Sequence, residues 1–176
     1  ELEETDLQIN KQSVYLRDYS GFPVYRNTRT EYFPVGEQLY QKMIEELKKA
    51  KYFIFLEYFI IDNGEMWGTI LDILEVKARA GLDVRLIYDD VGCVNTLPSK
   101  FYKEIRARGI KCEVFNPFRP VVSVVLNNRD HRKIMVIDGH TGFTGGINLA
   151  DEYINRKVRF GSVSYTHLRA HETLRH

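Results

Sequence analysis

The 176-residue sequence lacks several features that assign a protein to a class at first sight. Its two cysteines, Cys93 and Cys112, stand in no spacing used by metal ligands, so reduced thiols are expected in preference to a metal site or a disulfide. Basic residues (25) and acidic residues (24) almost cancel, so charge indicates no anionic partner. Because no run of about 18 apolar residues occurs, no membrane-spanning helix is predicted.

What the sequence does contain is an alternation of helical and strand-like patterns. Apolar residues recur at helical spacing over 37–51, whereas 52–61 is a nearly continuous apolar run, typical of a strand covered on both faces. Residues 13–25 predict short strands and turns after a frayed lead-in over 1–10. The other predicted elements are helices over 63–80 and 99–108, strands over 84–88, 110–115, 133–137 and 142–144, and a helix beginning at 147. This alternation predicts an α/β fold, with a mainly parallel or mixed sheet flanked by helices.

The segment most informative about chemistry is His131-x-Lys133-x4-Asp138. Side chains alternate along a strand, so His131 and Lys133 are predicted to face the same side, about 7 Å apart along the chain. A phosphate group fits between two such side chains. Asp138 falls where the predicted strand ends and the chain turns through Gly139.

A second stretch, Gly145-Gly146-Ile147-Asn148, follows closely. Two glycines allow the backbone to approach a ligand. Asn148 offers an amide donor at the start of the predicted helix, where phosphate is favoured. We therefore predict that Gly145, Gly146 and Asn148 bind phosphate.

These residue types suit displacement at a phosphodiester. Imidazole, with an ordinary pKa of about 6.5, is a neutral and available nucleophile near pH 7. Lys133 and Asn148 can be aimed at the negative charge that spreads over the phosphate oxygens. A carboxylate such as Asp138 can orient the imidazole or offset the positive charge of the site.

Simpler interpretations compete at several positions. A histidine beside lysine and arginine is often only a solvated patch, although the full motif is far more demanding. Glu57, a charge inside an apolar strand, either pairs with a basic residue or faces the site, because burying it unpaired is costly. Asp89 and Asp90 are favoured as turn residues over ligand groups, which also occur at the carboxyl ends of strands. Alternation places Arg129 on the side of His131. The apolar stretch 121–126 is either a buried strand or a lipid-contacting segment.

The motif together with Gly-Gly-x-Asn resembles the signature of the phospholipase D superfamily, and residues 12–161 resemble bacterial cardiolipin synthases in particular. The resemblance implies an enzyme that moves a phosphatidyl group from one phosphatidylglycerol to His131 and then to a second phosphatidylglycerol, without a cofactor. Lys133 and Asn148 would hold the phosphate and Asp138 would support the site. It also implies a catalytic domain on the cytoplasmic face of a bacterial membrane and no nucleic-acid partner.

The sequence departs from this family pattern in three ways. Enzymes of the family carry two such motifs that form one site, yet none of the histidines after His131 begins a second one. The two N-terminal membrane helices of the family are absent. Residues 162–176 do not continue the family pattern and are expected to be a non-native tail. We therefore expect residues 1–161 to be the N-terminal catalytic half-domain of a longer protein, with the second half as its missing partner.

Two alternatives from the sequence keep the same motif. A short phospholipase D-type nuclease would complete its site with a second copy of the chain. A non-catalytic module would bind phospholipid without turnover.

Overall fold

The computed structural model describes residues 7–22, 27–117, 128–158 and 167–172. Its backbone contacts divide the chain into two units, and the larger, residues 29–172, carries the motif. In the smaller unit, helix α1 spans Leu7–Ser20, which corrects the prediction of strands and turns over 13–25. The apolar run at Val14–Leu16 suggested a strand. However, α1 contains no glycine or proline and is rich in Gln, Leu, Lys and Arg, which favour a helix. The helix ends just before Gly21, whose φ is +69°.

The larger unit is built on a mixed sheet. The strand order is β1-β7-β6-β5-β2-β3-β4. The strands are β1 Thr28–Phe33, β2 Phe53–Tyr58, β3 Asp83–Asp89, β4 Lys111–Phe115, β5 Lys133–Ile137, β6 Thr141–Gly145 and β7 His167–Glu172. Strands β2, β3 and β4 are parallel, whereas β5 is antiparallel to β2, β6 to β5, and β7 to β6. A mixed sheet is thus confirmed in preference to a mainly parallel one.

The hairpin between β5 and β6 explains why the sheet becomes antiparallel. Asp138 and Gly139, with φ of +53° and +73°, form its turn. Two successive residues with positive φ are typical of the tight turns that match the twist of antiparallel strands. β7 lies within 162–176, where the sequence showed no periodic pattern, and extends the sheet beyond β6.

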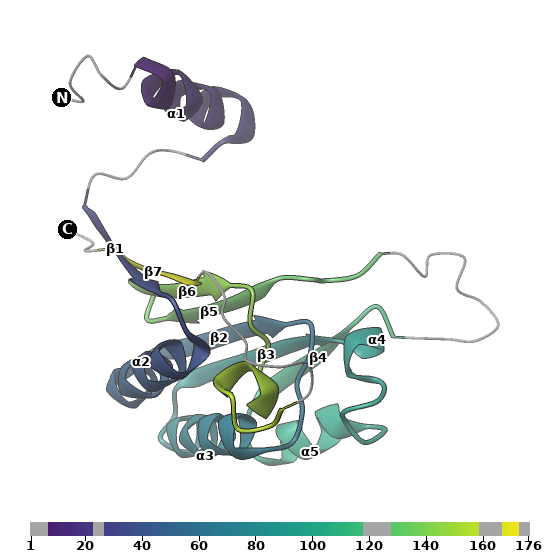
Figure 1. Ribbon diagram of the computed structural model, residues 1–176. Coiled ribbons are helices and arrows are strands. Elements are labelled where there is room, and N and C mark those ends of the chain that lie inside the picture. The colour runs from purple at the N-terminus through teal and green to yellow at the C-terminus, as the bar shows by residue number, and fades with distance from the viewer. Residues whose placement is uncertain (1–6, 23–26, 118–127, 159–166, 173–176) are drawn as a thin grey trace. The chain divides into compact units, whose positions relative to one another are not determined.

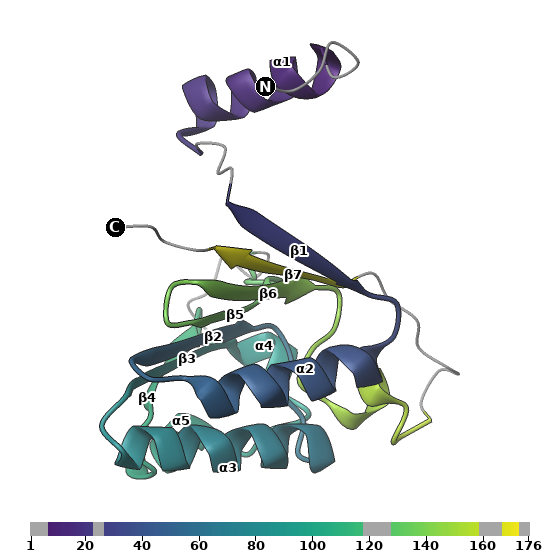
Figure 2. The ribbon, with the colours of Figure 1, turned by 90° about the vertical axis from the view of Figure 1, so that its left-hand side faces the viewer.

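Helices α2 (Gly36–Lys49), α3 (Glu65–Arg79) and α5 (Phe101–Ala107) cover the same face of the sheet (Figures 1 and 2). They confirm the three helices predicted nearby, and Gly81, with φ of +93°, follows α3 as expected. Ile54, Leu56 and Tyr58 of β2 face this layer and are buried, while the alternate residues are only half-buried. The expectation that β2 is covered equally on both faces was therefore wrong for the described residues.

Two short elements lie close to the motif. Helix α4 spans Asp90–Cys93, directly after β3. The 3-10 helix η2 spans Asp151–Ile154, so the helix predicted to begin at 147 was wrong. None of the helices in the described ranges is long and apolar enough to cross a membrane.

Candidate active site

His131 and Lys133 lie together at one edge of the sheet. Lys133 is the first residue of β5 and pairs with Tyr58, the last residue of β2. The ammonium Nζ of Lys133 donates a hydrogen bond to the carbonyl oxygen of His131 at 2.7 Å. Lys133 is only 6% exposed, whereas His131 is exposed. Because β5 runs against β2 and β3, this pair lies at the carboxyl ends of the parallel strands, where α/β sheets commonly bind ligands.

Phe59 joins the two side chains and was not identified from the sequence. The centroid of its ring lies 4.8 Å from the centroid of the His131 ring and 5.2 Å from Lys133 Nζ. The face of an aromatic ring attracts a cation. Burial lowers the pKa of Lys133, and the nearby charge of Asp130 opposes that effect. Lys133 thus carries a partly desolvated positive charge next to the backbone of the exposed His131.

Gly92 of α4 holds Phe59 in place through a close backbone approach. A Cβ atom at Gly92 would lie 2.1 Å from the carbonyl oxygen of Phe59 and 2.9 Å from its ring. Only glycine therefore fits between α4 and Phe59. Gly92, which follows the strand that ends in Asp89, is the one feature of the sequence that could have indicated a close backbone contact here.

Asp138 does not lie beside His131. It follows the far end of β5, five residues from Lys133, or about 16 Å along an extended strand. Its carboxylate accepts hydrogen bonds from the backbone N–H groups of Lys51, Tyr52 and Phe53 at 2.8, 2.8 and 2.9 Å. Burial alone would raise the pKa of Asp138, but these three donors outweigh it and the pKa is lowered. Asp138 therefore fastens the start of β2 to the β5–β6 turn and does not touch the imidazole.

Asn148 is buried and already bonded on both polar atoms. Its Oδ1 accepts from the backbone N–H of Ile60 at 3.0 Å, and its Nδ2 donates to the Tyr153 hydroxyl at 2.8 Å. It does not begin a helix, because Leu149 runs extended beside Ile61 and bonds to the backbone there. Asn148 thus holds the chain just after Phe59.

The two glycines lie nearer to the lysine. Gly145 ends β6, and both Gly145 and Gly146 are exposed. Gly145 and Lys133 line one small cavity of about 10 Å³, together with Ile147. The structure therefore brings Lys133 and Gly145 together, as the motif predicts, with Asn148 behind them.

Glu57 pairs with a basic residue, which was one of the two alternatives predicted from the sequence. Its Oε1 lies 2.5 Å from Arg132 Nη2, and Arg132 Nε donates to Asp130 Oδ1 at 3.0 Å. Burial, then a hydrogen bond with Asp130 and the charge of Asp130, raise the pKa of Glu57 to about 7. Burial would also raise the pKa of Asp130, but the bonds from Glu57 and Arg132 lower it. Of the two carboxyl groups, Glu57 is therefore the one that binds a proton more readily as pH falls to about 7.

Asp89 connects β3 to the residues before His131. Its fully buried carboxylate accepts from the backbone N–H of Gly92 at 2.9 Å and so caps α4, which confirms the predicted turn role. It also accepts from the backbone N–H of Asp130 at 3.0 Å and lies 3.3 Å from Arg129 Nη1. Arg129 donates further to the carbonyl oxygen of Asn116. Arg129 is thus oriented toward Asp89.

The arrangement amounts to an exposed imidazole whose neighbouring residues are held on both sides. The residue before His131 is tied to β3 through Asp89, and the two residues after it are tied to Glu57, Asp130 and Phe59. Lys133 supplies a buried positive charge at the same edge. Such a site can bind a phosphate group and attack its phosphorus atom.

Comparison with solved structures defines the class of fold. The chain is similar to a phospholipase D family member, Nuc from Salmonella typhimurium, with a TM-score of 0.58 and 18% identity over 82% of each chain. This likeness concerns the fold, which is that of the phospholipase D half-domain.

Comparison of sequences then identifies the family. The family described as "Cardiolipin synthase, PLD-like domain" matches residues 43–167. The chain is 50% identical over 160 residues to an uncharacterized protein of Streptococcus mutans, covering 91% of the chain and 35% of the relative. It is 36% identical over 170 residues to the major cardiolipin synthase ClsA of Bacillus subtilis, covering 95% and 35%. The chain therefore belongs to the cardiolipin synthase family of phospholipase D-like proteins, and it spans about a third of the length of these relatives.

Proposed function

We propose that this chain is the N-terminal catalytic half of a phosphatidyltransferase that makes cardiolipin from two phosphatidylglycerol molecules through a phosphohistidine. The observation that carries the proposal is the pair formed by His131 and Lys133. The exposed imidazole and a lysine that is 6% exposed contact the same Phe59 ring, and the lysine is bonded to the histidine backbone. The family membership of the chain supports the choice of substrate.

The first step uses the residues of this chain as follows. The imidazole of His131 attacks the phosphorus of phosphatidylglycerol, and the bond to the glycerol oxygen breaks. Lys133, with the backbone of Gly145 and Gly146, stabilises the charge on the phosphate oxygens, and Asn148 supports the site through its bonds to Ile60 and Tyr153. The acid that protonates glycerol is assigned to the second half of the full-length protein. Asp138 supports the site indirectly, through the position of β2 and β5.

Positioning roles fall to Glu57, Arg132, Asp130 and Arg129. They set the backbone on both sides of His131 through the bonds to Asp89 and to one another. The substrate is a lipid, so the partner surface is the bacterial membrane at its cytoplasmic face. No nucleic acid is required.

The test is the full reading frame that contains this chain, mixed with phosphatidylglycerol vesicles. We expect cardiolipin and glycerol, and an acid-labile phosphate on His131 after rapid quenching. His131→Ala should abolish all three, whereas His140→Ala, in the β5–β6 turn, should leave them within about twofold because it lies at the far end of β5. Cleavage of DNA without cardiolipin formation would instead indicate a nuclease, and lipid binding without turnover would indicate a binding module.

A further inference from the structure

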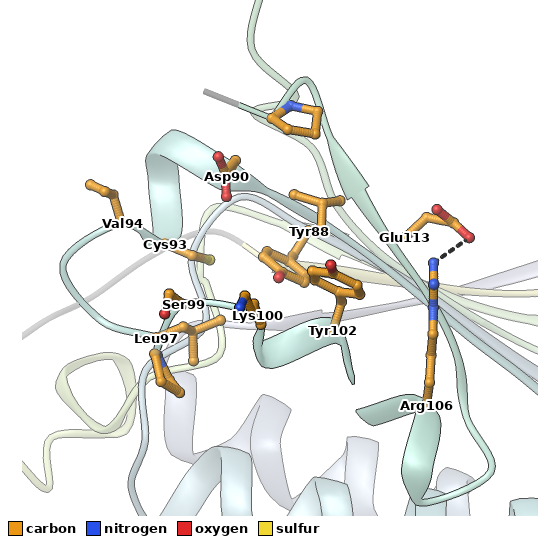
Figure 3. A pocket seen from close by; sticks show the side chains of 13 residues that line it. Tyr88, Asp90, Cys93, Val94, Leu97, Ser99, Lys100, Tyr102, Arg106 and Glu113 are labelled. Carbon is orange, nitrogen blue, oxygen red and sulfur yellow. Dashed lines mark hydrogen bonds and ion pairs between the residues drawn. The ribbon is translucent and has the colours of Figure 1, made fainter. Parts of the chain in front are cut away.

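A second cavity lies at the same edge of the sheet as His131. It has a volume of about 590 Å³ and opens between α4, α5 and the end of β4 (Figure 3). Small-molecule sites commonly have volumes of about 300–1,000 Å³. The cavity is therefore large enough for the head group and first methylenes of a lipid.

The cavity shares a wall with the candidate active site. Asp90 lines it, and the preceding residue, Asp89, holds the backbone N–H of Asp130 at 3.0 Å. Cys93 also lines it, and its Sγ accepts from the backbone N–H of Ile61 at 3.3 Å, two residues beyond Phe59. β3 and β5 flank β2, and Tyr88 and Lys133 both pair with Tyr58. The Tyr88 side of the cavity is therefore two strand spacings, or about 10 Å, from Lys133. A ligand in the cavity can therefore extend to His131.

One positive charge in the cavity has no partner of opposite sign. Arg106 pairs with Glu113 at 2.7 Å, and its guanidinium lies 5.1 Å from the Tyr102 ring centroid, so its charge is offset (Figure 3). The backbone carbonyl of Lys100, at the start of α5, accepts from Lys103, but its ammonium group makes no ion pair or hydrogen bond with the residues that the structure describes. Lys100, Tyr88 and Tyr102 line the same cavity (Figure 3). This end of the cavity suits one phosphate group.

The remaining lining is divided between apolar and acidic groups. Val94, Leu97 and Val114 supply apolar lining to the cavity. Asp90, the first residue of α4, lies on the opposite side of Tyr88 from Lys100 (Figure 3). A carboxylate accepts hydrogen bonds from hydroxyl groups. The lining thus combines apolar groups, a cation and a hydroxyl acceptor, and the acceptor directly follows Asp89, which binds the residue before His131.

We propose that this cavity binds the acceptor phospholipid, with its phosphate on Lys100, its first methylenes along Val94 and Leu97, and its glycerol extending past Asp90 toward His131. The proposal rests on the proposed function. In the transfer step the acceptor hydroxyl oxygen bonds to phosphorus while the phosphorus–nitrogen bond to His131 breaks. The electron pair of that bond returns to the imidazole, and the hydroxyl proton passes to the base left when glycerol was protonated.

Two rates measured on the full reading frame separate the acceptor from the donor. Exchange of labelled glycerol into phosphatidylglycerol uses His131 but no acceptor lipid, whereas cardiolipin formation uses both. Lys100→Glu should lower cardiolipin formation tenfold or more and leave glycerol exchange within twofold. Lys103→Glu, an equal charge change on α5 outside the cavity, should change neither rate. Retained exchange also shows that the variant is folded.

A variant that fills the cavity tests the same assignment without changing charge. Val94→Trp, at a position 61% exposed on the rim, should also reduce only cardiolipin formation. Val76→Trp, at a 65% exposed position on α3, is the matched control. Parallel loss of both rates, or loss of neither, in Lys100→Glu and Val94→Trp would overturn the acceptor site. Absence of both rates from the unsubstituted enzyme would instead remove the proposed function, and the acceptor site with it.

Direct binding distinguishes a lipid from a free anion. By calorimetry, monomeric dihexanoylphosphatidylglycerol should bind at least fivefold more weakly to Lys100→Glu than to the unsubstituted protein. Glycerophosphoglycerol, which has no acyl chains, should bind more weakly than the lipid because it leaves the apolar wall uncovered. Equal affinity for inorganic phosphate and for the lipid would show an anion site only and would contradict the proposal.

Discussion

The buried carboxylate of Asp89 accepts a hydrogen bond from the backbone N–H of Asp130, 3.0 Å away, and this bond ties the end of β3 to the residue before His131. The same carboxylate caps α4 and pairs with Arg129. One side chain therefore positions the residue before His131 and also caps α4, which forms a wall of the second cavity.

Replacing Asp89 should therefore reduce stability strongly. In Asp89→Asn one carboxylate oxygen is replaced by an NH₂ group, which cannot accept from the backbone N–H groups that Asp89 binds. The negative charge opposite the half-buried Arg129 is also lost. We expect a loss of about 2–4 kcal/mol in the free energy of unfolding, measured by urea denaturation. Asp72→Asn, on the exposed side of α3, should change it by less than about 0.5 kcal/mol. An equally small effect at both positions would refute the anchoring role of Asp89.

A pair of glycine substitutions tests the packing of Phe59. Gly92→Ala places a methyl group 2.1 Å from the Phe59 carbonyl oxygen, so Phe59 and the His131 ring must move. We expect a loss of about 1–3 kcal/mol from overpacking, and at least tenfold lower turnover in the full-length enzyme. Gly68→Ala meets no atom within 4 Å in α3 and should stabilise the protein by about 0.5–1 kcal/mol. Turnover unchanged in Gly92→Ala would show that Phe59 does not position His131.

Stability should fall as pH rises through the titration of Glu57. Its pKa in the folded protein is raised to about 7, so the folded state binds this proton more tightly than the unfolded state. The stabilising contribution is fully present below the ordinary carboxyl pKa and is lost as pH rises toward 7 and beyond. In Glu57→Gln this decline between about pH 4.5 and 7 should disappear. Urea midpoints from pH 4.5 to 8 measure it, with Glu113→Gln at the exposed ion pair as the control. An unchanged pH profile in Glu57→Gln would exclude the shared proton.

The opposite sign applies to Asp138. Its pKa is lowered in the folded protein, so its contribution is present above the ordinary carboxyl pKa and is lost as pH falls below it. Asp138→Ala leaves the N–H groups of Lys51, Tyr52 and Phe53 without their acceptor and should cost about 2–3 kcal/mol at pH 7. The difference from the unsubstituted protein should shrink below about pH 4. A stable variant that has lost only turnover would argue for a direct catalytic role instead.

The sequence by itself determined the local parts of this protein. The periodicity of α2 and α3, the apolar run of β2 and the glycine after α3 each depend on neighbours within a few residues, so they could be predicted. The motif also predicted that His131 and Lys133 lie together, because they are only two residues apart near the start of one strand. The turn role of Asp89 was predictable for the same reason.

Only the tertiary structure decided which distant groups meet. Asp138, Asn148 and Glu57 bind residues that are distant in the sequence, namely Phe53, Ile60 and Arg132, and the alternation of apolar residues does not specify which strand pairs with which. The antiparallel half of the sheet follows from the turn at Asp138 and Gly139, and the extended course of Leu149 from backbone bonds to Ile60 and Asp62. The motif His-x-Lys-x4-Asp therefore names three residues, of which two lie together at the candidate active site, while long-range hydrogen bonds engage the third at the opposite end of the strand, where it holds the sheet.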